Sequence, residues 1–164
     1  TDPDWLARVA AHRARRPATW STQESGDLVG ALGLGQPVLV DCLGTWLTGL
    51  VDTAGAWEWP VDRLESLVAA ELDRLLPALA AATADVVLVT NEVGWGAVPS
   101  HRSGRVFRDL LGTATQRVAS AGGPRSVSDE VSKLRTPTRL AGSPRCSWVT
   151  VSGSWRVSAA AGPD

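Results

Sequence analysis

The sequence predicts an α/β fold, a mostly parallel sheet flanked by helices. Three consecutive segments indicate it: an apolar strand at 37–41, a long amphipathic helix at 60–83 and a second apolar strand at 86–90. Strands joined through a helix lie parallel in one sheet, and the helices cover the faces of that sheet. A further helix predicted at 102–120 supplies another covering element.

The first predicted helix covers residues 4–15, with Asp4 as its N-cap. It ends at Arg16, because a residue that precedes a proline is pushed out of the helical region. The strand at 37–41 (PVLVD) follows a Gly-Gln-Pro turn and ends on the carboxylate of Asp41.

The long helix at 60–83 begins at Pro60, which suits a first helical turn, and keeps apolar residues at three-and-four spacing. We expect Pro77 to kink this helix or to split off its last turn. The strand at 86–90 (VVLVT) is continuously apolar, which is typical of strands buried on both faces.

The chain divides into a domain at 1–131 and an atypical tail at 132–164. The tail is rich in Ser, Gly, Pro and Ala and has no sustained period, so we expect it to be loosely ordered. WVTVS at 148–152 is its one stretch with strand character. The chain contains no Met, so we expect Thr1 to lie inside a longer protein.

Composition excludes several classes of protein. The net charge of −1 gives no case for nucleic acid as the main partner, and no apolar stretch approaches a membrane span. The polar N-terminus is not a secretory signal, which makes the cytoplasm the expected compartment. Two cysteines make neither a disulfide scaffold nor a metal site.

Asp41 ends an apolar strand in VLVDCLGTWL, which has the form of a Walker-B element. A carboxylate at the end of a parallel strand can hold Mg²⁺ beside nucleotide phosphates. The simpler interpretation is a turn or helix cap, because apolar strands often end in Asp.

His12 lies among arginines in RVAAHRARRP. Nearby positive charge keeps an imidazole neutral and nucleophilic toward phosphorus, and the same arginines neutralise phosphate oxygens. A solvated basic helix with an incidental histidine is the alternative.

The loop NEVGWGAVP at 91–99 directly follows the second apolar strand, and R-V-F-R-D at 105–109 follows it. Loops in this position line the binding crevice of open α/β sheets, and their glycines allow close backbone approach. A plain strand-to-helix turn with a solvated Glu92 is the alternative.

Together and in this order, these segments resemble the bifunctional adenosylcobinamide kinase / adenosylcobinamide-phosphate guanylyltransferase family. The matching pieces are RVAAHRARRP, W-x-T-x-E at 20–24, LVDCL-x-x-WLT at 39–48, LVTNEVGWGAVP at 88–99 and R-x-FRD-x-x-G at 105–112. The resemblance covers roughly residues 4–131.

The resemblance implies a P-loop-type (RecA-like) α/β fold and a homotrimer whose subunits share their sites. It also implies an enzyme of cobalamin biosynthesis that phosphorylates adenosylcobinamide with ATP or GTP. The same enzyme then transfers GMP from GTP to the new phosphate through a guanylyl-histidine.

Residue by residue, the resemblance makes His12 the GMP acceptor and Asp41 the Walker-B carboxylate, with Mg²⁺ as its ion. The implied nucleotide contacts are Arg13, Ala14, Arg15, Arg16, Glu24 and Asp41. The candidate substrate-loop residues are Asn91, Glu92, Gly94, Arg105, Arg108 and Asp109.

The sequence departs from the family pattern in several places. Gly49 stands where asparagine is common, and Ser132-Lys133-Leu134 leads into an Arg/Ser/Pro-rich stretch where similar proteins have a final apolar strand. Similar proteins begin with a strand and a G-G-x-R-S-G-K-S loop, whereas the single lysine here, Lys133, has no glycine loop beside it. We therefore expect the N-terminal strand and the P-loop to be missing, with harm to triphosphate binding and to the fold. Gly44 stands where similar proteins favour threonine.

Two alternatives to the active enzyme remain open. The first is a catalytically impaired remnant that binds nucleotide or corrinoid. The second is an unrelated α/β binding domain with accidental matches.

Overall fold

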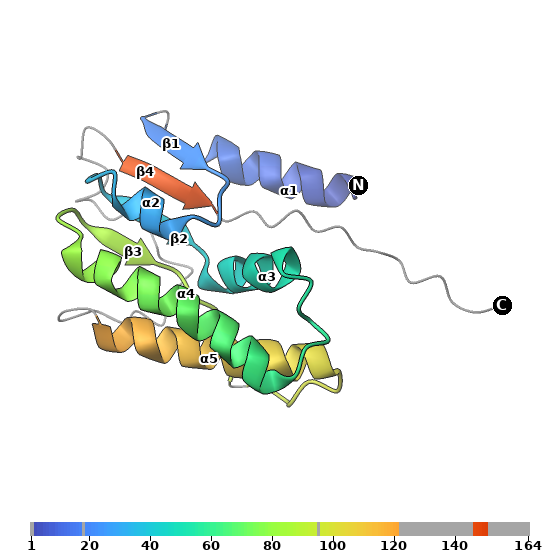
Figure 1. Cartoon of the computed structure of the whole chain (residues 1–164). Helices are drawn as coiled ribbons and strands as arrows, with labels where there is room; N and C mark the ends of the chain where they lie inside the picture. The colour runs from blue at the N-terminus through green and yellow to red at the C-terminus, as the bar shows by residue number, and fades with distance from the viewer. Residues whose placement is uncertain (1, 18, 95, 122–145, 151–164) are drawn as a thin grey trace.

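A computed structural model describes residues 2–17, 19–94, 96–121 and 146–150, with the backbone alone for Trp5, His12 and 146–150. Helices and strands alternate along most of the chain (Figure 1). In chain order the elements are α1 (Pro3–Ala14), β1 (Trp20–Gln23), α2 (Leu28–Leu32), β2 (Val38–Asp41), α3 (Leu43–Thr53), α4 (Val61–Ala81), β3 (Val86–Leu88), α5 (Arg102–Ala121) and β4 (Cys146–Thr150).

The strands form one sheet in the order β1-β4-β2-β3, and every described pair is parallel. The register places Val38 beside Val86 and Asp41 beside Thr150. Parallel strands need crossover connections, and α3 with α4 supplies the one between β2 and β3. The predicted α/β class is therefore confirmed.

The strand β4 lies between β1 and β2 and pairs with both. Its residues come from the range predicted as a tail, and they overlap the WVTVS stretch in which strand character was noted. The other residues of 132–164 lie outside the described part of the chain. The place beside β2 is thus filled by a segment distant in sequence, and among the described strands β1 pairs with this segment alone.

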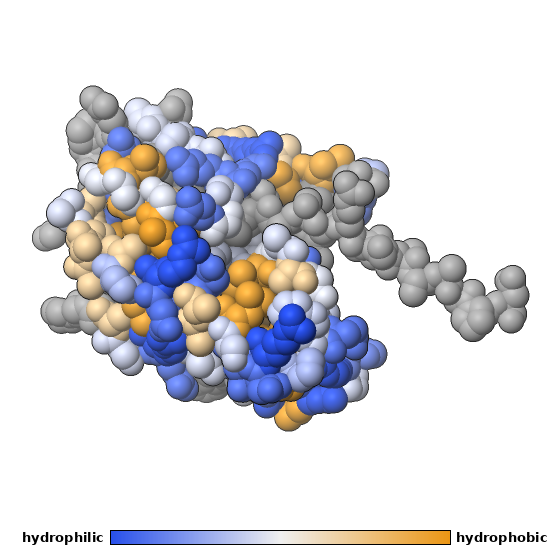
Figure 2. All heavy atoms as spheres, viewed as in Figure 1, coloured by the Kyte–Doolittle hydropathy of each residue, from blue (hydrophilic) through white to orange (hydrophobic). Residues whose placement is uncertain are grey.

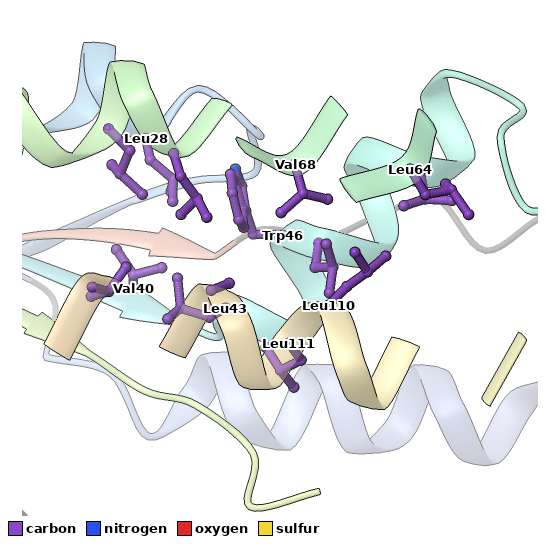
Figure 3. Packing of buried hydrophobic residues seen from close by; sticks show 14 of the residues in the cluster. Leu28, Val40, Leu43, Trp46, Leu64, Val68, Leu110 and Leu111 are labelled. Carbon is purple, nitrogen blue, oxygen red and sulfur yellow. The ribbon is translucent and has the colours of Figure 1, made fainter. Parts of the chain in front are cut away.

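The main core lies between one face of the sheet and the helices α2 to α5. Figure 3 shows Val40 of β2 next to Leu43 of α3, with Leu110 and Leu111 of α5 farther along the core and Trp46 of α3 beside Val68 of α4. Each such side chain contributes about 1.5–3 kcal/mol through burial. This shared core holds α5 in a fixed position relative to β2. It therefore also sets where the residues at the carboxyl ends of the strands lie relative to α5.

The opposite face of the sheet carries a second, smaller cluster. Trp20 and Leu39 are buried there, and Val87 and Val89 pack against them. Alternate residues of β2 therefore serve opposite faces, as the two-residue period of a strand requires. This places Val40 in the main core and Leu39 on the far side.

The predicted helices are confirmed with two corrections, and a third correction concerns the strand predicted at 86–90. The N-cap of α1 is Asp2, whose Oδ1 accepts from the amide of Asp4 at 3.0 Å. The helix α4 continues through Pro77, so the expected split of its last turn is wrong. Half-buried residues make up β3, because it is an edge strand rather than one buried on both faces.

Sequence periodicity missed three elements, namely β1, α2 and α3. The helix α2 has only five residues, too few to show a helical period. On the face seen in Figure 2, hydrophilic residues are spread over the surface, over α4 in particular, with hydrophobic ones between them. Within the described residues, every helix is too short or too polar to span a bilayer.

Candidate functional site

The carboxyl ends of the strands lie along one edge of the sheet, because the strands are parallel. Gln23 ends β1, Asp41 ends β2, and the loop to α5 follows β3. Ligands of open α/β sheets bind at this edge. The residues predicted as nucleotide and substrate contacts come from the segments that meet here.

Asp41 is half-buried at the end of β2, and its carboxylate lies close enough to Arg16 to affect the pKa of the guanidinium. Burial lowers the pKa of the Arg16 guanidinium, Arg13 lowers it further, and Asp41 acts in the opposite sense. An arginine keeps its proton near neutral pH despite such a shift. The two residues therefore form an acidic and basic pair at the sheet edge.

Two arginines join the end of α1 to β1 and the loop after it. Arg13 forms an ion pair with Glu24. The Nη1 of Arg16 donates to Oγ1 of Thr22 at 2.9 Å. Four of the predicted nucleotide contacts thus come together, at 13, 16, 24 and 41.

The remaining predicted contacts of α1 are placed differently. Arg15 donates from Nε to the carbonyl of Ala11 at 3.4 Å, so it folds back along its own helix. Ala14, the last residue of α1, is exposed. The backbone of His12 lies in α1, but its side chain lies outside the described part of the structure.

The junction between β2 and α3 is packed against the loop after β3. The thiol of Cys42 donates to Oδ1 of Asn91 at 3.3 Å and lies 3.3 Å from Oγ1 of Thr45. A Cβ added to Gly44 would stand 2.6 Å from the same Asn91 oxygen. Glycine at 44 therefore allows Asn91 to approach the first turn of α3.

A trough lined mainly by polar and charged residues lies between this loop and the outer face of α5. It consists of two adjoining hollows of about 400 and 430 Å³, which share Val93, Gly94, Gly112 and Gln116. Asn91, Glu92 and Thr115 line the first hollow. Arg108, Asp109 and Thr113 line the second.

Five of the six predicted substrate-loop residues therefore line the trough. The exception is Arg105, whose Nη1 donates to the carbonyls of Pro99 and Ser100 at 3.1 and 2.6 Å. It holds the backbone that enters α5. Inside the trough, Nε of Arg108 lies 3.3 Å from Oδ1 of Asp109.

Sequence reasoning found Arg108 and Asp109 on the α5 side of the trough but missed Gly112, Thr113, Thr115 and Gln116 as lining residues. A signal was available, because positions 108, 112, 115 and 116 repeat at three-and-four spacing along one helix face. That these positions meet the loop at 91–94 depends on how α5 packs, and periodicity does not report packing.

Asp41 fits the use that nucleotide sites make of Mg²⁺. This ion keeps several waters and binds through one or two carboxylates together with substrate phosphates. Within the described residues no three metal-ligating side chains gather, so an all-protein cage is excluded there. Among the described residues, Asp41 is the candidate for such a carboxylate, half-buried and beside Arg16.

The parallel sheet, its helical cover and the acidic strand end define an α/β fold of the P-loop type. Residues 1–127 match the family model described as "Cobinamide kinase / cobinamide phosphate guanyltransferase". The chain belongs to this family.

Curated relatives agree with this assignment. The chain is 37% identical over 129 residues to the bifunctional adenosylcobalamin biosynthesis protein CobU of Escherichia coli, covering 73% of this chain and 71% of the relative. It is 36% identical to CobU of Salmonella typhimurium, with the same coverage. It is 37% identical over 123 residues to CobP of Pseudomonas aeruginosa, covering 72% of this chain and 66% of the relative.

Proposed function

We propose that this chain is an enzyme of adenosylcobalamin biosynthesis that transfers GMP from GTP to adenosylcobinamide phosphate through His12. The full proposal adds phosphorylation of adenosylcobinamide with ATP or GTP, in the cytoplasm. One observation carries it. Within the span that matches the family, Arg13, Arg16, Glu24 and Asp41 meet at the sheet edge, on and beside the helix that holds His12.

The residues suit the chemistry of GMP transfer. The imidazole of His12 attacks the α-phosphorus of GTP, a P–N bond forms, and pyrophosphate leaves as the P–O bond breaks. A phosphate oxygen of the corrinoid then attacks the same phosphorus, and the P–N bond breaks. Arg13 and Arg16 neutralise charge on the phosphates. Asp41 would hold Mg²⁺, which supplies further neutralisation when it is bound.

Labelling with GTP that carries radioactive α-phosphate tests the proposal. The expected adduct is labile in acid and stable in base, and it is lost in His12→Ala. His101→Ala is the matched control, since the chain has two histidines and His101 lines neither hollow of the trough. Full labelling of His12→Ala, or loss of label in His101→Ala alone, would refute the assignment.

The two carboxylates are tested by isosteric variants. Asp41→Asn and Glu92→Gln should each lower turnover at least tenfold, because the proposal assigns Asp41 to the nucleotide and Glu92 to the substrate loop. Their melting temperatures should stay close to that of the parent chain. A loss of stability comparable to that of a core deletion would show that the carboxylates are structural instead.

A nucleotide- or corrinoid-binding remnant is the second candidate. The 164 residues of this sequence contain no G-x-x-x-x-G-K-[ST] sequence, and their single lysine is Lys133. In P-loop enzymes such a loop cradles the triphosphate during phosphoryl transfer. Binding of GTP with neither a GMP adduct nor phosphorylated adenosylcobinamide would establish the remnant.

We also propose a homotrimer whose neighbouring subunits share sites. The exposure of α1 supports this, because a helix of 12 residues gains most of its stability from packing. Leu6 on that helix is 53% exposed in the single chain. Light scattering coupled to gel filtration gives the molar mass, and a monomer would refute this part of the proposal.

A further inference from the structure

Gly112 lies in the middle of α5, where packing gives no reason for a glycine. A Cβ added there would meet no atom within 4 Å. Gly104 in the same helix differs, since its Cβ would stand 2.7 Å from Cβ of Pro99. An interior helix glycine costs about 1 kcal/mol relative to alanine. At Gly104 the close approach of Pro99 explains why a glycine is needed, whereas at Gly112 no neighbouring atom explains it.

The open space over Gly112 belongs to the trough. Gly112 lines both hollows, and so does Gly94 on the opposite loop, which also has no atom within 4 Å of an added Cβ. Two glycines without packing neighbours therefore bound the same space. Glycines in such positions leave room for a molecule that approaches the backbone closely.

The charges and hydrogen-bonding groups that line the trough indicate which class of molecule it can bind. Its charged groups are Glu92, Asp109 and Arg108, and Arg108 already pairs with Asp109 at 3.3 Å. One net negative charge disfavours the phosphates of a nucleotide. The amide of Gln116 offers a donor and an acceptor, which is the complement of another carboxamide. Asn91 adds the donor of its NH₂ group, because its Oδ1 already accepts from Cys42.

We propose that the trough binds the carboxamide-bearing rim of the corrinoid, with Gly112 as the residue that admits it. The identity of the ligand rests on the proposed function. Corrinoids such as cobinamide carry several carboxamide arms around the ring. Each hollow has a volume typical of small-molecule sites, which suits one edge of such a ring with its arms rather than the whole of it.

The test measures how tightly dicyanocobinamide binds to the full chain. Equilibrium dialysis separates bound from free corrinoid, and the absorbance of the corrinoid gives both concentrations. Gly112→Ala should weaken binding at least tenfold, because its methyl group enters the space shared by the two hollows. Gly49→Ala is the matched control: it also lies inside a helix, has no atom within 4 Å and lines neither hollow. Both variants should melt at or above the temperature of the parent chain.

A second comparison tests the chemical class. Cobyrinic acid has carboxylates where cobinamide has carboxamides, and it should bind at least tenfold more weakly because Glu92 and Asp109 repel it. Gln116→Leu should reduce this preference for the amide. Equal binding of the two corrinoids, or no binding of dicyanocobinamide at all, would overturn the proposal.

GMP labelling of the same variants separates this inference from the proposed function. Gly112→Ala should still form the GMP adduct as the parent does. Lost labelling with unchanged corrinoid binding would make the trough a nucleotide site and overturn the inference. A parent chain that forms no adduct, but binds dicyanocobinamide in a Gly112-dependent way, would refute the proposed function and leave the trough assignment standing.

Discussion

Arg102, the first residue of α5, should stabilise the fold by about 3 kcal/mol through two hydrogen bonds to backbone carbonyls. Its Nη1 and Nη2 donate to the carbonyls of Trp57 and Trp59, in the connection between α3 and α4. A hydrogen bond to a charged group contributes about 1.5–3 kcal/mol. Arg102 is half-buried, so water can partly replace it, and we take the lower value for each bond.

Arg102→Ala should therefore lower the free energy of unfolding in urea by about 3 kcal/mol, which corresponds to about 6–12 °C in melting temperature for a chain of this size. Arg102→Lys should lose about half as much, because one ammonium cannot match both carbonyls as a planar guanidinium does.

Arg105→Ala is the control for this prediction. Arg105 is exposed and also donates to two backbone carbonyls, but from the single nitrogen Nη1. Arg105→Ala should lower the free energy of unfolding by less than about 1 kcal/mol. Equal losses for Arg102→Ala and Arg105→Ala, or a loss below about 0.5 kcal/mol for Arg102→Ala, would refute the reasoning.

Three further predictions concern the core, the junction at Asn91 and the surface ion pair. Leu47→Ala should cost about 2–5 kcal/mol in urea unfolding, because Leu47 is 0% exposed and its removal leaves a cavity. Gly44→Ala should be less stable than Gly49→Ala in thermal melting, since only the Cβ at 44 meets Asn91, at 2.6 Å; equal stability would contradict the close approach. Arg13→Ala should change stability by less than about 1 kcal/mol, because its ion pair is exposed, yet lower GMP labelling at least tenfold; unchanged labelling would remove Arg13 from the site.

The long, periodic segments were predictable from sequence because their signal is local. The run PVLVD gave β2, and the three-and-four spacing of apolar residues gave α4 and α5 to within two residues at each end. Short elements carry little of this signal. The strand β1, with the sequence WSTQ, has no clear alternation, and among the described strands it pairs with β4.

The sequence also indicated the residues at the sheet edge and the loop side of the trough. RVAAHRARRP and VLVD pointed to Arg13, Arg16 and Asp41, which the structure brings toward one another. The loop at 91–94 was singled out as well, and it lines the trough. The predictions of His12 as the GMP acceptor and of Glu92 as a substrate-loop residue stay predictions, to be tested by labelling and turnover.

By itself, the sequence determined the α/β class, the family and the chemical groups available, since strand and helix periods and local motifs are written in neighbouring residues. Tertiary structure alone decided which of these groups meet. Gly112 and Gly94 lie 18 positions apart and share a hollow only because the core holds α5 beside β3 and β2. The same holds for β4, whose place between β1 and β2 depends on backbone pairing across more than 100 residues, which no local pattern records.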